Sequence, residues 1–548
     1  MTRFKKTAAG VLTAALCITL IIPVGAEGAA KKPKLSKSKL SVKTGKTATL
    51  KVKNAAKAKI SWKSNKKKIA KVKASGKYGC KITGVKRGNA VITCRIKKGK
   101  KTTTLKCKVT VQPSKKTDSS KKTPAPSNTP PATPAPSPMI TPPNPETPTP
   151  VPTPDPNSIL GKYNDIFPYL GNCLNSWQLQ NAEILSHVKK HYNSFTLENE
   201  MKPSSLLGFW ATTISKKQAR EKGYILPDTY KETYVPQLNF EQLDKSIETA
   251  FKNGLKMRGH TLLWHSQTPQ WFFVKDYKNG SAVVTEEVMD ARLEFYISTV
   301  MSHVMEKEIE LTGEAGSIVY AWDVVNEYLH HGYAGNITTW TSVYGEQNLK
   351  PTYVKKAYEL AYEQLEKYDA QDKVTLFYND YDTYFNADHL VKLVNYINEG
   401  EETEICNGIG MQSHLDVDRP TLDVYKKALD MFLDTGLEIQ ITELDVTINW
   451  DHKSAYDYKD EGQTDEDQAA YVRDFMEMVV NTQKNRDTTV NEKGITSLTI
   501  WGLYDSVSWR GGAQQKGNSR PTLFDTSIND PKPSFEEFLS AADVWHQS

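Results

Sequence analysis

Eight short apolar runs, separated by amphipathic segments, constrain the fold of residues 159–548 more strongly than any other feature of the sequence. Segments between the runs, such as EQLDKSIETAFKNG, have the apolar spacing of a surface helix. Strand and helix alternating eight times predict an α/β fold, a (β/α)8 TIM barrel with insertions. The runs lie near residues 166–174, 192–198, 256–264, 319–326, 374–381, 407–414, 438–445 and 497–504.

Most of these runs end in polar or charged residues. In a (β/α)8 barrel the carboxyl ends of the strands form one mouth, and the chemistry of such enzymes takes place there. We therefore expect the side chains at the run ends to gather around a single site. They are Glu198, His265, Glu327, Asp380, His414, Glu443 and Asp505.

Two of the run ends carry carboxylates suited to acid–base and nucleophilic chemistry. The fourth run is followed by Glu327, and alternation along the seventh run places Glu443 and Asp445 on one face. Strands four and seven lie on opposite sides of a barrel mouth, so their carboxylates can flank a groove. Glycoside hydrolysis uses such a pair, one to protonate the leaving oxygen and one to attack the anomeric carbon. An isolated strand-end glutamate would instead be interpreted as a salt-bridged surface residue.

Seven motifs, in the order of a known family, carry a resemblance over residues 160–545. They are FTLENEMKP (195–203), RGHTLLWHSQTPQW (258–271), WDVVNE (322–327), YNDY (378–381), GIGMQSH (408–414), ITELDV (441–446) and WGLYDSVSW (501–509). With these motifs the chain resembles the family 10 glycoside hydrolases, the endo-β-1,4-xylanases of a retaining (β/α)8 clan. The resemblance implies hydrolysis of internal β-1,4-xylosidic bonds of plant xylan by a retaining double displacement.

The resemblance also implies catalytic roles for individual residues. Glu327 would be the general acid/base and Glu443 the nucleophile, while Asn326 would hydrogen-bond the 2-hydroxyl of the sugar at the −1 site. His414 would hold Glu443, and Asp445 would lie behind His414. Because the acid must stay protonated near neutral pH, we expect the pKa of Glu327 to be raised, partly by the charge of Glu443.

Further residues would orient the nucleophile or bind the sugar chain. Tyr381 is a further candidate to orient the nucleophile. Trp501 and Trp509 would form apolar walls, because pyranose rings pack their C–H faces on flat aromatic side chains. The residues implied on the glycone side of the cleft are Glu198, Asn199, Lys202, His260, Trp264 and Gln412.

Two features depart from the family pattern. Pro203 follows Lys202 where many family members carry Trp, so the packing of the glycone can differ. Residues 208–238 form a long insertion with several tyrosines after the second run. We expect this insertion to extend the glycone end of the cleft.

Two other functions stay open on sequence grounds. A clan-related β-1,4-glucanase or cellobiohydrolase would need room near Trp501 and Trp509 for the C6 hydroxymethyl group of glucose. A non-enzymatic cell-wall carbohydrate-binding protein would be expected to lack one of the two glutamates, and both are present.

Residues 31–112 differ sharply in composition from the rest of the chain. They hold 28 Lys and Arg and no Asp or Glu, whereas the net charge of the whole chain is only +8. Runs such as TATLKVK and NAVITCRI alternate apolar and polar residues, which predicts a small antiparallel β-sandwich. The pattern resembles the bacterial immunoglobulin-like domains. Either a solubilising spacer or attachment to an anionic polymer, such as wall teichoic acid or acidic plant polysaccharide, fits this charge. We expect no nucleic-acid partner, because no aromatic binding motif accompanies the lysines.

Residues 1–26 have the pattern of a secretory signal peptide. Basic residues precede an apolar run that Pro23 ends, and small residues lead to a cleavage site near Ala26. The run is too short to span a bilayer comfortably. We therefore expect a secreted, extracellular protein without a membrane anchor, with cell-wall association as one option. Residues 113–158 form a Pro/Thr-rich linker, since residues 121–160 hold 15 of the 28 prolines, and should be extended.

No residue pattern calls for a cofactor or a metal, and the family resemblance implies a monomer without a cofactor. His260 and His265 lack a third ligand at metal spacing, and the acidic stretch 457–467 lacks the ligand order of a calcium loop. Five cysteines remain after signal cleavage, too few for a disulfide framework, and a bridge among the first three stays open. These cysteines are Cys80, Cys94, Cys107, Cys173 and Cys406.

Overall fold

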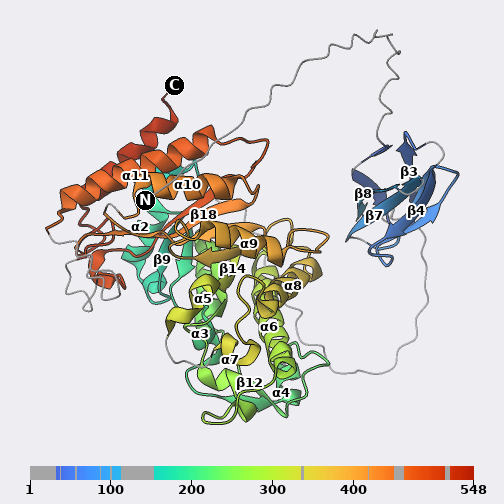
Figure 1. Cartoon of the computed structure of the whole chain (residues 1–548), viewed down its shortest axis with the longest axis horizontal. Coiled ribbons are helices and arrows are strands. Elements are labelled where there is room, and N and C mark those ends of the chain that lie inside the picture. The colour runs from blue at the N-terminus through green and yellow to red at the C-terminus, as the bar shows by residue number, and fades with distance from the viewer. Residues whose placement is uncertain are drawn as a thin grey trace, which may run out of the picture. The chain divides into compact units, whose positions relative to one another are not determined.

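The computed structural model describes residues 33–112 and 153–547, except 38, 56–57, 87, 99–100, 335–338, 418, 450–461 and 512–518. The chain divides into two compact units, Met1–Asn144 and Pro145–Ser548 (Figure 1). The predicted signal peptide, nearly all of the predicted linker and part of the acidic stretch 457–467 lie outside the described residues. Among the described helices, none combines the length and apolarity needed to cross a membrane.

Two four-stranded sheets form the first unit. Their orders are β1-β3-β6-β5 and β2-β8-β7-β4. Apolar side chains from both sheets, including Leu50, Ile82, Ile92 and Val109, share one buried core, which confirms the predicted all-β sandwich. The strands are β1 (Lys34–Leu35), β2 (Lys39–Lys43), β3 (Thr47–Lys53), β4 (Lys59–Ser64), β5 (Ala70–Ala74), β6 (Gly79–Gly84), β7 (Gly88–Lys98) and β8 (Lys101–Gln112).

One strand pairing in this unit differs from the prediction. Strand β2 pairs with β8 in parallel, with Leu40 opposite Val109, whereas the sequence predicted an antiparallel sandwich. A period-two pattern shows which residues face the core, but it carries no information on the direction of the neighbouring strand. The bridge left open among the first three cysteines is not formed. The free, buried cysteines are Cys80, Cys94, Cys107, Cys173 and Cys406.

Eight parallel strands close the barrel of the second unit. Each strand pairs with the next strand of the ring along the chain, and β19 pairs with β9 to complete it. The predicted (β/α)8 barrel is confirmed, and each predicted run overlaps one of its eight strands. A short additional strand, β17 (His414–Asp416), lies beside β18. The barrel strands are β9 (Tyr169–Leu174), β10 (Ser194–Leu197), β13 (Lys256–Trp264), β14 (Val319–Asn326), β15 (Thr375–Asp380), β16 (Gly408–Met411), β18 (Glu438–Thr447) and β19 (Ile495–Ile500).

Helices alternate with the barrel strands. Helix α5 is typical, because Leu243, Ile247 and Ala250 recur on its buried face and Gly254 ends it at a φ of 67°. The α-helices are α1 (Ile159–Tyr163), α2 (Ala182–His191), α3 (Pro203–Leu207), α4 (Lys216–Glu221), α5 (Glu241–Asn253), α6 (Glu286–Thr312), α7 (Trp340–Tyr344), α8 (Thr352–Lys367), α9 (Ala387–Ile397), α10 (Leu422–Leu433), α11 (Asp465–Asn485) and α12 (Pro533–Ser540). The 3-10 helices are η1 (Gln178–Gln180), η2 (Gln270–Phe273), η3 (Lys275–Tyr277), η4 (Tyr328–Ala334), η5 (Asp505–Val507) and η6 (Ala541–Trp545).

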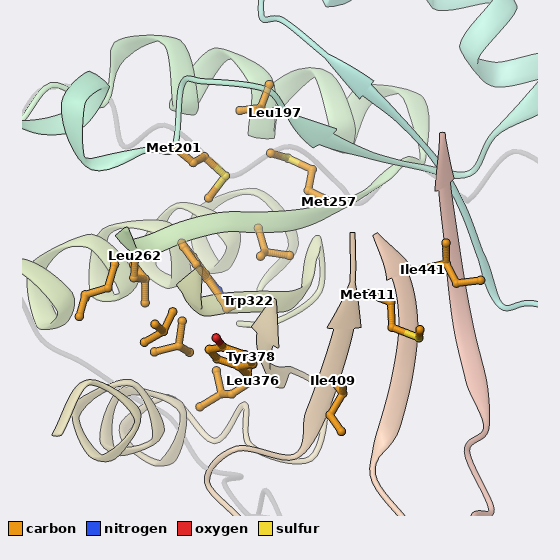
Figure 2. Packing of buried hydrophobic residues seen from close by; sticks show 14 of the residues in the cluster. Leu197, Met201, Met257, Leu262, Trp322, Leu376, Tyr378, Ile409, Met411 and Ile441 are labelled. Carbon is orange, nitrogen blue, oxygen red and sulfur yellow. The ribbon is translucent and has the colours of Figure 1, made fainter. Parts of the chain in front are cut away.

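Buried side chains pack closely on the barrel strands. Figure 2 shows buried side chains of several strands in one continuous apolar core, including Met257, Trp322 and Leu376. Gly259 of β13 stands opposite Trp322 of β14, and a Cβ added there would lie 2.4 Å from the indole ring. The indole of Trp322 therefore packs against the backbone of Gly259 at a distance that only glycine permits.

The insertion 208–238 is a folded element of the second unit. It contains α4 and an antiparallel pair of short strands, β11 (Thr213–Ser215) and β12 (Tyr234–Pro236). Arg292 of α6 is fully buried and forms an ion pair with Glu232 of the insertion at 2.5 Å. Its guanidinium also lies 4.0 Å from the centre of the Tyr277 ring. These contacts anchor the insertion on the barrel.

Candidate active site

A cleft of about 1120 Å³ is lined by residues at the carboxyl ends of the barrel strands. The catalytic and sugar-binding residues predicted from the sequence all line it except Asp445, which is 2% exposed and lies behind His414. Three of the run-end residues expected at the site do not line it either, and one of them, Asp505, instead forms an ion pair with Lys532 at 3.1 Å. These three are His265, Asp380 and Asp505. The predicted residues that line it are Glu198, Asn199, Lys202, His260, Trp264, Asn326, Glu327, Tyr381, Gln412, His414, Glu443, Trp501 and Trp509.

Three donors fix the carboxyl group of Glu327. This residue directly follows β14, and its backbone φ is 58°. Its Oε2 accepts a hydrogen bond from Nε1 of Trp264 at 2.8 Å. Its Oε1 accepts from Nδ2 of Asn326 at 3.0 Å and from Nε2 of Gln412 at 2.9 Å. The carboxyl therefore has one defined orientation in the cleft.

Burial is the main reason why the pKa of Glu327 is raised from its usual 4.5 to about 7. The charge of Asp380 raises this pKa further, whereas the hydrogen bonds from Gln412 and Trp264 lower it. The charge of Glu443 raises it least. The sequence predicted that the pKa of Glu327 is raised, and it attributed part of the rise to the charge of Glu443. In the structure, burial and the charge of Asp380 raise this pKa more than Glu443 does. A carboxyl with this pKa holds a proton near neutral pH and can donate it.

Glu443 of β18 has the opposite electrostatic environment. Nε2 of His414 lies 3.3 Å from its Oε2, and Nδ2 of Asn379 donates to its Oε1 at 2.8 Å. Burial alone would raise its pKa. The hydrogen bond and charge of His414, with the charges of His260 and Lys202, instead lower the pKa of Glu443 to about 2. Glu443 is therefore a carboxylate near neutral pH.

His414 is held as a cation between two carboxylates. Its Nδ1 donates to Oδ2 of Asp445 at 2.9 Å, while its Nε2 faces Glu443. Oδ1 of Asp445 accepts from Arg510 at 2.7 Å, so a buried guanidinium completes the row. Burial lowers the pKa of His414, but the two carboxylates raise it to about 9. The sequence missed Arg510, which no strand pattern marks.

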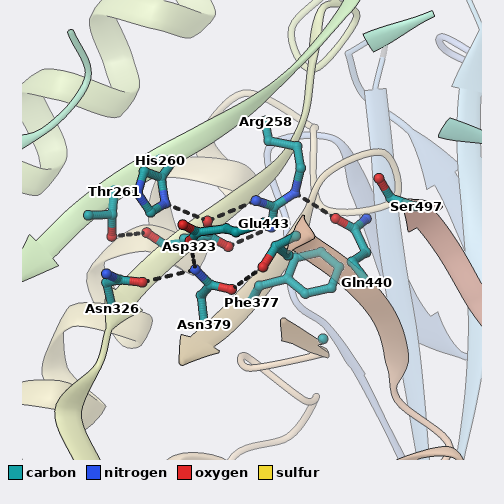
Figure 3. A network of polar contacts seen from close by, with 12 residues as sticks. Arg258, His260, Thr261, Asp323, Asn326, Phe377, Asn379, Gln440, Glu443 and Ser497 are labelled. Carbon is teal, nitrogen blue, oxygen red and sulfur yellow. Dashed lines mark hydrogen bonds and ion pairs between the residues drawn. The ribbon is translucent and has the colours of Figure 1, made fainter. Parts of the chain in front are cut away.

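The amide of Asn379 joins the surroundings of the two glutamates. This residue of β15 is fully buried, and its Nδ2 donates to Oδ1 of Asn326 at 2.9 Å as well as to Glu443 (Figure 3). Its Oδ1 accepts from the hydroxyl of Thr442 at 2.6 Å. Sequence reasoning missed Asn379. The signal was available, because period-two alternation places it on the same side of the strand as Tyr381.

A second buried network positions His260. Asp323 accepts from both terminal nitrogens of Arg258, at 2.9 and 2.6 Å, and lies 2.9 Å from Nδ1 of His260 (Figure 3). Nε of Arg258 donates to Gln440 at 2.7 Å. The His260 ring meets Trp501 edge-on at 5.6 Å. Arg258 and Asp323 lie 65 positions apart in the sequence, so a search for motifs of short spacing could not predict that they form a pair.

The predicted sugar-binding residues differ in how openly they face the cleft. Nζ of Lys202 lies 4.8 Å from the centre of the Trp264 ring, and Oε2 of Glu198 accepts from Asn175 at 2.8 Å. Trp509 is 49% exposed and presents an open ring, whereas Trp501 is 4% exposed. A ligand would therefore find its broad aromatic surface at Trp509.

Tyr381 stacks on His330 with ring centres 3.9 Å apart. Nδ1 of His330 lies 2.7 Å from Oδ1 of Asp380, and His330 also lines the cleft, although the sequence did not single it out. The role predicted for Tyr381 toward the nucleophile stays a prediction. Within the described ranges, no cluster of three or more His, Cys, Asp or Glu side chains is arranged to hold a metal ion.

Comparisons with known proteins agree with this geometry. The sequence model of glycosyl hydrolase family 10 matches residues 158–541, which lie in the second unit. Endo-1,4-beta-xylanase A of Butyrivibrio fibrisolvens is 40% identical over 385 residues, which cover 70% of this chain and 84% of that protein.

Solved structures of related proteins share the fold. The CBM22-1–GH10 modules of a Clostridium thermocellum endo-1,4-beta-D-xylanase, complexed with xylohexaose, align at a TM-score of 0.55 and 27% identity, over 70% of this chain and 67% of that chain. A GH10 xylanase from termite gut that contains a bacterial Ig-like domain aligns at a TM-score of 0.51 over 93% of this chain and 99% of that chain. At 20% identity, this second likeness is one of fold alone.

Proposed function

Because the chain belongs to glycosyl hydrolase family 10, we propose that it is an endo-1,4-β-xylanase that cleaves internal bonds of plant xylan with retention of configuration. One observation carries the proposal. Two buried glutamates of one cleft have opposite pKa shifts, to about 7 for Glu327 and about 2 for Glu443. A protonated acid beside an ionised carboxylate is what a double displacement needs.

In the first step, Glu443 attacks the anomeric carbon while Glu327 donates its proton to the glycosidic oxygen. The bond to the leaving sugar breaks, and an ester forms between the remaining sugar and Oε1 or Oε2 of Glu443. His414 keeps the nucleophile ionised and oriented through its hydrogen bond to Oε2. Asn326 and Asn379 link the two glutamates through hydrogen bonds. Asn379 donates to Glu443 and to Asn326, and Asn326 donates to Glu327.

In the second step, water replaces the carboxylate at the anomeric carbon. Glu327, now ionised, accepts a proton from that water and returns to its acid form, while Glu443 leaves as the carboxylate. Two inversions at one carbon give net retention. The charge on Glu443 is absent in the ester. Since this charge raises the pKa of Glu327, its loss lowers that pKa and suits the change of role from acid to base.

Reducing-sugar release from glucuronoxylan, run beside carboxymethylcellulose, tests this function. We expect the wild type to hydrolyse xylan much faster than the cellulose derivative, and Glu327→Ala and Glu443→Ala to lose this activity. Glu399→Ala, at a side chain 65% exposed on the barrel surface, is the matched control and should keep it. Recovery of Glu327→Ala by azide, with a β-glycosyl azide as product, would support retention.

Two outcomes would contradict parts of the proposal. Wild-type rates in both alanine variants would remove the two-glutamate mechanism. A wild type that prefers the cellulose derivative would leave the mechanism intact but would make the enzyme a β-1,4-glucanase.

We also propose that the protein is exported and that its first unit attaches it to an anionic polymer of the cell wall or the plant substrate. Support comes from charge. Residues 31–112 contain no carboxylate that could neutralise their 28 basic side chains, and no described lysine in this unit is buried. A surface of this kind attracts polyanions strongly at low ionic strength.

Sedimentation with cell walls, before and after extraction of their teichoic acid, tests this attachment. The full chain should bind the untreated walls, and binding should fall as salt is added or when residues 31–112 are deleted. Equal binding with and without these residues would assign them the role of a spacer. Detection of the protein in culture medium, with its N-terminus near residue 27, would support export.

A further inference from the structure

Phe209 and Trp210 are the most exposed large apolar side chains among the described residues. Their exposed fractions are 80% and 81%, while no other large apolar side chain in the described part exceeds 56%. Folded chains normally cover adjacent aromatic rings, and an exposed aromatic pair next to a cleft indicates a contact surface. The pair lies at the start of the insertion 208–238.

No residue of the insertion 208–238 lines the cleft itself, but the aromatic pair follows closely in the chain after Lys202, which the family resemblance assigns to the glycone side. Lys202, which lines the cleft, is the N-cap of α3, and this helix has five residues. At ~1.5 Å per residue the helix is about 8 Å long, so Phe209 lies only a short distance beyond Lys202. The hydroxyl of Ser204 in α3 also donates to Gln267, another residue of the cleft wall, at 3.2 Å.

A packed support holds the pair at this place. Gly208 turns the chain at a φ of 85°, a conformation that favours glycine, and its carbonyl accepts from Nε1 of the buried Trp271 at 3.1 Å. On the other side, the amide of Gln237 donates to the carbonyl of Thr212 at 2.8 Å, next to the β11–β12 pair. The backbone on both sides of the two rings is therefore fixed, while the rings themselves stay exposed.

We propose that Phe209 and Trp210 form a binding platform for the xylan chain where it leaves the glycone end of the cleft. The inference rests on the proposed function and adds a contact outside the cleft. A xylopyranose ring has two apolar C–H faces and lacks the C6 hydroxymethyl group, so it packs flat on an aromatic ring. The platform would bind sugar units remote from the bond that is cleaved, so it would act only on long chains.

The double variant Phe209→Ala/Trp210→Ala, compared with wild type on two substrates, tests the platform. On p-nitrophenyl β-xylobioside, which fills only positions next to the cleaved bond, we expect an unchanged kcat/KM. On long xylan we expect KM to rise about fivefold with kcat unchanged, as the loss of one or two aromatic contacts predicts. Trp210→Tyr keeps a flat ring, so its KM for long xylan should stay close to that of the wild type.

Phe251→Ala is the matched control. This side chain is 44% exposed near the C-terminal end of α5, whose chain direction places it toward the amino ends of the strands and away from the mouth. Phe251→Ala should leave the kinetic constants on both substrates unchanged. An unchanged KM for long xylan in the double variant, or an equal loss on both substrates, would overturn the platform. A wild type inactive on xylan would instead refute the proposed function.

Size-exclusion chromatography separates the platform from a contact between two copies of this chain. We expect the wild type and the double variant to elute at the same monomeric volume. A wild-type dimer that becomes a monomer in the double variant would assign the two rings to an interface and overturn the proposal.

Discussion

Replacement of His414 by alanine should move the acid limb of the pH–rate profile into the measurable range. In the wild type the pKa of Glu443 is about 2 instead of 4.5. This difference corresponds to roughly 3 kcal/mol in favour of the carboxylate. Burial opposes it, so the donors and charges around Glu443 more than offset the loss of water.

Among the interactions that lower the pKa of Glu443, the hydrogen bond from His414 has the largest effect. Without it, burial still raises the pKa, while the charges of His260 and Lys202 and the hydrogen bond from Asn379 still favour the carboxylate. We therefore expect the pKa of Glu443 to rise by about 1 to 3, the size of the effect of one opposite charge at this distance. Loss of orientation should also lower kcat/KM at pH 6 by about ten- to a hundredfold.

Initial rates on p-nitrophenyl β-xylobioside from pH 3 to 9 provide the assay. The wild type should stay active down to pH 3 and lose activity above about pH 7, where Glu327 gives up its proton. The variant should keep the alkaline limb, because the charge of Glu443 contributes least to the pKa of Glu327. Circular dichroism at each pH shows that the protein is folded.

His303→Ala is the control, since His303 forms a similar pair with Asp244 at 2.7 Å between α6 and α5, outside the cleft. Its profile should match that of the wild type. If His414→Ala keeps full activity at pH 3 while folded, the electrostatic account of Glu443 is wrong. A wild-type alkaline limb near pH 4.5 would contradict the account of Glu327.

Three further predictions concern the buried framework of the cleft. Asn379→Ala removes the donor shared by Asn326 and Glu443, and kcat should fall at least about tenfold with little change in KM, measured by steady-state kinetics on xylan; equal kcat would contradict the shared role. Arg292→Met leaves the carboxylate of Glu232 without its partner at the base of the insertion, so urea unfolding should report a loss of about 3–5 kcal/mol, and a loss below ~1 kcal/mol would be contrary to this reasoning. Gly259→Ala places a Cβ 2.4 Å from the ring of Trp322, and the melting temperature should fall as expected for a cost of about 1–3 kcal/mol; an unchanged melting temperature would show that the indole of Trp322 can move aside.

Periodicity predicted the barrel well because it reports burial, and the strands of a parallel barrel are buried along their whole length. Periodicity predicted the ends of the strands less well. The run 407–414 divides into β16 and β17, since Ser413 adopts a φ of 64° between them. Such a backbone change leaves no trace in an apolar pattern. In the same way, the parallel pairing of β2 and β8 could not be predicted from alternation.

The residues of the candidate site divide according to the kind of information that reveals them. The motif resemblance brought in the groups that line the cleft, such as Glu327 and Glu443, and these do lie together. The groups that position them, Asn379 and Arg510, are buried polar side chains whose partners lie far away in the sequence. Only the folded chain shows which of its many polar residues meet.

The backbone of Glu327 has a consequence for the long-term history of the protein. A glutamate at a φ of 58° is destabilised by roughly 1 kcal/mol or more compared with a glycine at the same position. If activity were not under selection, mutations that replace Glu327 would tend to accumulate. The resulting protein would be more stable but, under the proposed mechanism, inactive. A library sorted by heat resistance alone should lose the acid early, whereas a library sorted by activity should collect its stabilising changes on the outer helices instead.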